Sequence, residues 1–144
     1  KKLRSYGGAP LPLPIQEVSQ LAWDDEEHVM INRNLYRRKY KISDKIFKNM
    51  HSFKPLEAGF FLWLKVGNDE EFTSLLWKKH GIRCLPGSYL TYQGKDCLHS
   101  DNPGSDFIRV ALVHPIEKTA FGLTKIAKAL NLETEKEIES YVSS

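Results

Sequence analysis

The sequence is poor in cysteine, and this shortage excludes one class of small protein. Only 2 of its 144 residues are cysteine, so a disulfide framework cannot hold the chain together. A reducing compartment is therefore expected, and because no signal-peptide pattern is present we expect a cytoplasmic location. Cys84 and Cys97 do not form a C-x-x-C motif, so we do not expect them to act as a redox pair.

Long hydrophobic runs and a strong charge imbalance are also missing. The longest apolar run, residues 58–64, has the length of a strand and is far shorter than the ~20 residues of a membrane-spanning helix. Lys and Arg number 21 against 18 Asp and Glu, a net charge of +3, which is too small to indicate nucleic-acid binding by itself. The 9 Gly and 7 Pro form no repeat. We expect one compact domain that neither spans a membrane nor binds nucleic acid.

The beginning of the chain indicates a piece of a longer protein. The first residue is Lys1 rather than Met, so we expect a fragment or a processed product. Residues 1–14 combine a Gly-Gly pair with prolines at three alternating positions, a composition that keeps the chain extended. Such a segment cannot bury a core of its own, and it needs a partner surface unless it is disordered.

Hydrophobic periodicity predicts helices packed on a small sheet. The expected elements are helices at 14–23 and 24–50, a strand at 58–66, a helix from 69 to about 80, a short strand at 82–85, a loop at 88–106, a strand at 107–113 and a helix at 115–130. Asp24 and Asp69 are expected to cap their helices. The apolar strand at 58–66 is expected to be central and covered on both faces. The fold class is α/β, in an α+β-like form with a small mixed sheet.

The helix expected at 24–50 begins with acidic residues and continues with basic ones. This order complements the helix dipole, so we interpret its basic side chains as a solvated face. Tyr36 and Tyr40 lie on an apolar stripe and are interpreted as core. Two stripes are expected to be buried: Ile31, Leu35, Ile42 and Ile46, and beside them Tyr36, Tyr40 and Phe47. RNA binding by the helix from Arg33 to Lys48 stays open as an alternative.

Arg109 is the most informative single residue. It lies in the apolar strand expected at 107–113, where a guanidinium is costly to bury unless an anion meets it. Its planar fork binds a carboxylate through two parallel hydrogen bonds. The alternative is a strand-edge arginine that reaches solvent or pairs with an internal Glu.

The sequence contains no complete active site. Residues 96–101 contain four potential metal ligands, but their spacing matches no zinc pattern, so we interpret the segment as a polar loop and expect no metal. No nucleophile elbow and no phosphate-binding glycine motif is present.

Several stretches resemble the class I/II, or fold-type I, pyridoxal-phosphate aminotransferases. Residues 59–64, GFFLWL, are similar to a "G-F-hydrophobic-W-L" strand of that family, and residues 85–90, LPGSYL, to its "PGS-aromatic" turn. Residues 102–104, NPG, and 107–113, FIRVALV, are similar to its final strand. The succinyldiaminopimelate aminotransferase branch is most similar to the combination of residues 85–90 with 102–113, and its interdomain helix is similar to residues 24–29 and 32–40. The resemblance runs from about residue 3 to 130.

The resemblance implies the C-terminal part of a longer enzyme. Residues 1–14 would be an arm severed from the large domain, 15–50 interdomain helices, 51–132 the small α/β domain and 133–144 a polar tail. The family's Schiff-base lysine lies in the large domain, and its motif is not found here, so no catalytic residue is expected in this chain and it should be inactive alone. Arg109 falls on the arginine that binds the substrate α-carboxylate. Ser5 and Tyr6 fall on a segment that approaches the partner subunit's site.

The resemblance also implies a substrate pair. The intact enzyme would be a homodimer that uses pyridoxal phosphate to transfer an amino group between glutamate and N-succinyl-2-amino-6-oxopimelate, in diaminopimelate and lysine synthesis. No cofactor is expected on the fragment itself. The alternative is a stand-alone anion-binding or regulatory module that keeps Arg109 and needs no cofactor.

Overall fold

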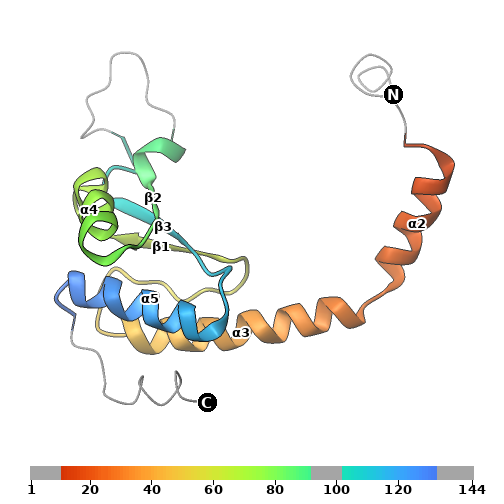
Figure 1. Cartoon of the computed structure of the whole chain (residues 1–144), viewed down its shortest axis with the longest axis horizontal. Helices are drawn as coiled ribbons and strands as arrows, with labels where there is room; N and C mark the ends of the chain where they lie inside the picture. Colours follow the sequence, from red (N-terminus) through yellow and green to blue (C-terminus); the bar gives the residue numbers. More distant parts are fainter. Residues whose placement is uncertain (1–10, 92–101, 133–144) are drawn as a thin grey trace. The chain divides into compact units, whose positions relative to one another are not determined.

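The computed structural model describes residues 11–91 and 102–132. Its elements, in order, are α2 (Leu13–Asp24), α3 (Glu27–Phe47), β1 (Phe61–Lys65), α4 (Asp69–Leu75), the π-helical turn η1 (Leu76–His80), β2 (Leu85–Pro86), the 3-10 turn η2 (Gly87–Leu90), β3 (Phe107–Ala111) and α5 (Ile116–Ala129) (Figure 1). This order of helices and strands is the one that the sequence predicts. The chain divides into two compact units, residues 1–35 and 36–144, and each is described by itself.

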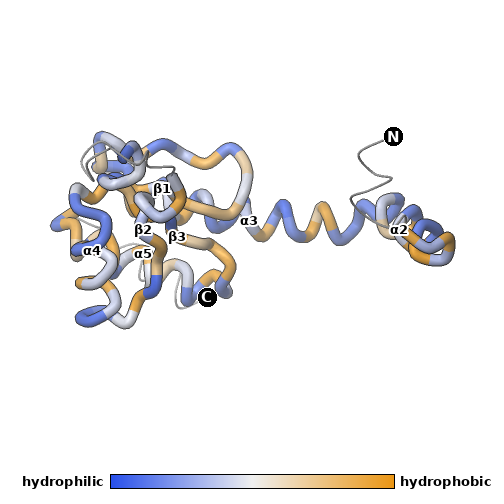
Figure 2. The backbone as a smooth tube through the Cα atoms, turned by 90° about the horizontal axis from the view of Figure 1, so that it is seen from above, coloured by the Kyte–Doolittle hydropathy of each residue, from blue (hydrophilic) through white to orange (hydrophobic). Residues whose placement is uncertain are grey.

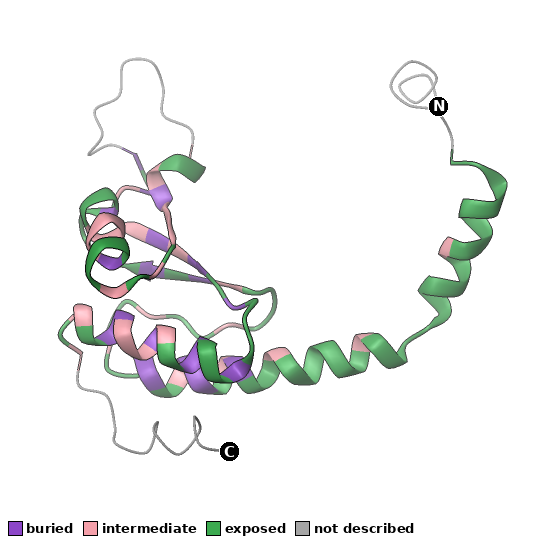
Figure 3. Cartoon of the chain, in the orientation of Figure 1, coloured by how far each residue is buried: buried purple, intermediate pink, exposed green. Residues whose placement is uncertain are grey.

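The described part of the first unit is helical and has little buried surface. No residue of α2 is buried, although the helix contains several large apolar side chains (Figure 3). The predicted cap of α3 was wrong by one residue, because Asp25 rather than Asp24 accepts a hydrogen bond from the backbone N–H of Glu27, at 3.0 Å. The Asp25 carboxylate also lies 3.0 Å from Nδ1 of His28, and this contact is the main reason why the pKa of Asp25 is lowered.

The predicted apolar stripes of α3 are only partly confirmed. Hydrophobic and hydrophilic residues alternate along the helix (Figure 2), and Ile42, Ile46 and Phe47 are buried in the core. Ile31 and Leu35 lie earlier in the helix and are exposed, so their expected burial was wrong for the described residues. Periodicity marks one face of a helix, but it does not show how far along the helix other elements cover that face.

The sheet of the described residues has three strands in the order β1-β3-β2, and both pairings are antiparallel. The expected mixed sheet was therefore wrong in that detail. The expected central position of the strand at 58–66 was also wrong, because β3 is central and β1 lies at an edge. Leu62 and Leu64 are buried on one face, whereas Trp63 on the other face is 40% exposed.

The core lies on one face of this sheet. Buried side chains of the C-terminal half of α3, of the turn η1 and of α5 form one cluster with the inward side chains of β1 and β3. The predicted apolar stripe of α5 is confirmed, since Ile116, Ala120, Leu123 and Ala127 are all buried. The α/β fold class is confirmed. The opposite face of the sheet, which bears Arg109, is left more open.

Lys39 is the one lysine buried in the core of the described residues, with an exposed fraction of 2%. Its Nζ donates a hydrogen bond to the backbone oxygen of Leu112, at 2.6 Å, and lies 4.7 Å from the centroid of the Tyr36 ring. Tyr36 and Tyr40 pack against the core, as predicted. The interpretation of the basic side chains of this helix as a solvated face was therefore wrong for Lys39. Lys39 joins α3 to the segment after β3.

The buried position of Lys39 should make the stability of the chain depend on alkaline pH. Burial lowers the pKa of Lys39 below its ordinary value of 10.5, so near pH 10 the unfolded chain binds more protons than the folded chain. The free energy of unfolding should therefore rise as the pH increases through the folded pKa toward 10.5. Urea unfolding of the wild type and of Lys39→Met at several pH values should show this rise in the wild type alone. Lys41→Met, at an exposed position of the same helix, is the control, and identical pH profiles for wild type and Lys39→Met would contradict the expectation.

Candidate functional site

Arg109 lies in the middle of the central strand. In the register of the sheet it stands opposite Trp63 of β1 and Leu85 of β2. Its neighbours Ile108 and Val110 are buried in the core, and successive side chains of a strand point to opposite faces. Arg109 therefore projects from the face of the sheet that lies away from the core, where it is half-buried.

The Arg109 guanidinium lies over an aromatic ring. Its Cζ lies 4.2 Å from the centroid of the Phe61 ring, a distance at which a cation is attracted to the ring face. On the same face Trp63 and Phe107 stack, with centroids 5.7 Å apart and an interplanar angle of 17°. The Phe61 ring therefore covers one side of the cation.

No carboxylate of the described residues forms an ion pair with Arg109. The predicted alternative of an internal Glu partner therefore finds no support in the described part of the chain. A guanidinium that rests on an aromatic ring and keeps its N–H donors available can bind a carboxylate through two parallel hydrogen bonds. Such a site binds and orients an anion, and it supplies no acid, base or nucleophile of its own.

The structure brings the turns at 86–88 and 102–104 together at the end of the sheet. Nδ2 of Asn102 donates to the backbone oxygen of Ser88 at 3.1 Å, and its Oδ1 accepts from the backbone N–H of Gly104 at 2.8 Å and from the Thr91 hydroxyl. Gly87 and Gly104 pack backbone against backbone: a Cβ on Gly104 would lie 2.2 Å from the Gly87 oxygen. These contacts hold the short strand β2 beside Arg109.

Asp69 strengthens the same junction from α4, and its predicted role as a helix cap was wrong. Asn68 is the cap, since its Oδ1 accepts from the backbone N–H of Glu71 at 3.1 Å. Asp69 is fully buried, and its Oδ2 accepts from the backbone N–H of Ser88 at 2.8 Å. Sequence reasoning missed both Asp69 and Asn102 as junction residues. The Asn-Pro-Gly motif at 102–104 was the available signal, because asparagine before a turn often bonds to nearby backbone.

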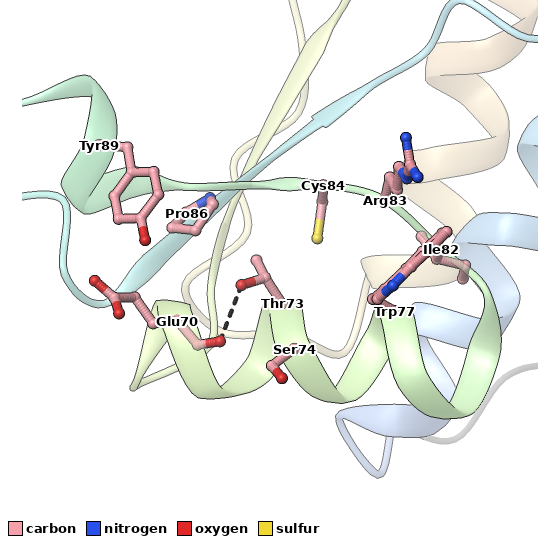
Figure 4. A pocket seen from close by; sticks show the side chains of 9 residues that line it. All are labelled: Glu70, Thr73, Ser74, Trp77, Ile82, Arg83, Cys84, Pro86 and Tyr89. Carbon is pink, nitrogen blue, oxygen red and sulfur yellow. Dashed lines mark hydrogen bonds between the residues drawn. The ribbon is translucent and has the colours of Figure 1, made fainter.

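A separate hollow of about 350 Å³ lies beside α4, η1 and β2 (Figure 4). Trp77, Arg83, Cys84 and Tyr89 are among its lining residues, and the Arg83 guanidinium lies 4.3 Å from the Trp77 ring centroid. Burial raises the pKa of the Cys84 thiol to about 11, so this cysteine is protonated at neutral pH and is a poor nucleophile.

Several predicted features lie outside the described residues. They are Ser5 and Tyr6 of the arm and the polar segment 96–101, which includes Cys97. Within the described ranges, no group of three or more His, Cys, Asp or Glu side chains could hold a metal ion. In the same ranges, no helix is both long and apolar enough to cross a bilayer.

Comparison with known proteins gives matches among solved structures. A scan against models of protein families finds no match, and a search of curated proteins finds none. An aminotransferase from Neisseria meningitidis Z2491 is 35% identical over 88% of this chain, with a TM-score of 0.77. Aminotransferase AspB from Helicobacter pylori 26695 is 30% identical over 92%, with a TM-score of 0.73.

A third solved structure supports the fold alone. An archaeal alanine:glyoxylate aminotransferase matches 67% of this chain with a TM-score of 0.55 and 24% identity. The chain spans 32% of the Neisseria and Helicobacter proteins and 24% of the archaeal one. The chain is therefore similar, in fold and in sequence, to one segment of the Neisseria aminotransferase. That segment makes up 32% of the Neisseria protein.

Proposed function

We propose that the chain is the C-terminal part of a pyridoxal-phosphate-dependent aminotransferase. Residues 15–50 would form the interdomain helices, 51–132 the small domain, 1–14 an arm from the large domain and 133–144 a tail. The 35% identity to the Neisseria aminotransferase over 88% of the chain supports this assignment. The main structural support for this function is Arg109. Its guanidinium lies over the Phe61 ring and has no carboxylate partner among the described residues.

In the proposed enzyme Arg109 binds the α-carboxylate of the amino acid. Two parallel hydrogen bonds from a planar guanidinium fix both the position and the rotation of a carboxylate. The remaining bonds of the α-carbon are then presented in one orientation, and such positioning supplies a large part of the rate acceleration in enzymes. The same arginine would serve both half-reactions, because the amino donor and the product amino acid both carry an α-carboxylate.

We propose that this chain does not hold the cofactor by itself. Lys39, their one buried lysine, is engaged with the Leu112 backbone oxygen. Pyridoxal phosphate, when bound in such enzymes, serves as the carrier of the amino group. We propose that other parts of the longer protein hold it, and that this chain contributes the carboxylate-binding face of the site.

We further propose glutamate and N-succinyl-2-amino-6-oxopimelate as the substrate pair, in a cytoplasmic homodimer that serves diaminopimelate and lysine synthesis. The similarity of residues 24–29, 32–40, 85–90 and 102–113 to the succinyldiaminopimelate branch supports this choice. In the dimer, Ser5 and Tyr6 would approach the partner subunit's site.

The test is the intact mass of the native gene product, measured together with its visible absorption spectrum. We expect a mass well above 16.6 kDa and a visible absorption band that sodium borohydride abolishes. The purified protein should also consume N-succinyl-2-amino-6-oxopimelate when glutamate is supplied. A mass near 16.6 kDa with no visible band after addition of pyridoxal phosphate would refute the proposal and favour a stand-alone anion-binding module. A cofactor-bearing product that ignores this keto acid would refute the substrate pair alone.

A further inference from the structure

A second and larger hollow lies away from Arg109. Its volume is about 590 Å³, and it is bounded by the end of η1, the residues that lead into β2, the end of β3 and the first half of α5. Its inner surface is apolar, with Val110, Leu112 and Leu123 among the lining residues. Trp77 and Phe121, which are 50% and 58% exposed, add two aromatic side chains to the lining.

Every ionisable side chain that lines this hollow is basic. These residues are His80, Arg83, His114 and Lys118, and no Asp or Glu is among the lining residues. The chain as a whole contains 18 Asp and Glu beside 21 Lys and Arg and 5 His, so a lining without any carboxylate is a local feature. Basic groups at the edge of a low-dielectric concavity focus a positive potential in it.

Contacts within the wall hold parts of this lining in place. The Arg83 guanidinium lies 4.3 Å from the centroid of the Trp77 ring (Figure 4). Lys125 Nζ donates to the backbone oxygen of His80 at 3.4 Å and lies 4.5 Å from the Phe121 ring centroid. The hollow therefore has partly ordered aromatic walls before any ligand arrives, which lowers the entropic cost of binding.

We propose that this hollow binds a small organic anion that consists of a flat apolar ring system with a phosphate or carboxylate group. The apolar inner surface and the two aromatic side chains suit the ring, and the four basic groups suit the anion. Arg109 does not line the hollow, so this site is distinct from the proposed substrate site and does not depend on the proposed function.

The probe is 1-naphthyl phosphate, titrated into the full 144-residue chain and followed through backbone amide NMR shifts. We expect the largest shifts at residues 77–83 and in the first half of α5. The neutral analogue 1-naphthol should bind at least about tenfold more weakly, because charge-assisted hydrogen bonds are stronger than neutral ones. A parallel titration with 1-naphthoate shows whether a phosphate or a carboxylate is preferred.

Two variants test the basic lining. Arg83→Gln combined with Lys118→Gln should weaken the binding of 1-naphthyl phosphate about tenfold. Lys41→Gln removes one positive charge at an exposed position of α3 that does not line the hollow, and this variant should leave the affinity unchanged. Amide spectra of both proteins confirm that they are folded. The proposal is overturned if naphthol binds as tightly as the phosphate, if the shifts centre on Arg109, or if the double variant binds as well as Lys41→Gln.

Discussion

Lysine in place of Arg109 should lower kcat/KM for glutamate by about 10- to 150-fold in the longer protein, through both a higher KM and a lower kcat. Lysine keeps the charge but cannot present two parallel donors to one carboxylate. Losing one charge-assisted hydrogen bond costs about 1.5–3 kcal/mol, and each 1.4 kcal/mol is about a factor of ten. The lower kcat follows because a substrate held by one contact can rotate away from the reacting geometry.

Steady-state kinetics with glutamate and the keto acid would measure this effect. Arg38→Lys is the matched control, because it makes the same exchange at an exposed position of α3, and its kinetics should equal those of the wild type. Unfolding curves of both variants show whether the fold is preserved. If Arg109→Lys kept wild-type kinetics, Arg109 would not be the carboxylate ligand, although the aminotransferase assignment would stand.

Alanine in place of Gly104 should strongly lower the free energy of unfolding of the chain. The added Cβ would lie 2.2 Å from the backbone oxygen and 2.4 Å from the backbone carbon of Gly87. Backbone on one side and the Asn102 hydrogen bond to the Gly104 N–H on the other prevent a small adjustment. Overpacking a tight site costs about 1–3 kcal/mol and occasionally more, a large share of the roughly 5–15 kcal/mol by which domains are stable. We expect a loss of about 3 kcal/mol or more.

Gly122→Ala provides the control for the same chemical change. Gly122 lies within α5, and a Cβ there would meet no atom within 4 Å. Because glycine weakens a helix interior relative to alanine, this variant should be more stable by about 0.5–1 kcal/mol. Urea unfolding followed by circular dichroism measures both variants. A Gly104→Ala protein as stable as the wild type would show that the two turns are not packed as described.

Local pattern was a good guide wherever one element decides the outcome. The 4-3-4-3 spacing of apolar residues from Ile116 to Leu130 predicts both α5 and the face that it buries. The apolar run around Arg109 predicts a strand that contains one charged side chain. The strand is confirmed, and the binding role of Arg109 stays a prediction.

Pattern was a poor guide where the outcome depends on neighbours. The run at 58–66 is almost continuously apolar, which is typical of a strand with two covered faces, yet β1 lies at an edge with Trp63 exposed in the described structure. The exposed face of the sheet is unusually aromatic, and apolar composition does not say which element covers it or whether that element belongs to this chain. Asp69 has the sequence context of a helix cap, and the structure shows instead that Asn68 is the cap and that Asp69 binds the backbone N–H of Ser88.

The sequence by itself determined the order of helices and strands, the inward face of α5 and the likeness to aminotransferases, because spacing along the chain and short motifs carry that information. Only the tertiary structure decided that the turns at 86–88 and 102–104 meet, that Lys39 is buried against Leu112, and that Arg109 rests on Phe61. The first two contacts join residues that are 14 and 73 positions apart in the sequence, and the third joins two neighbouring strands. Such contacts depend on how whole elements pack, and no local pattern records that packing.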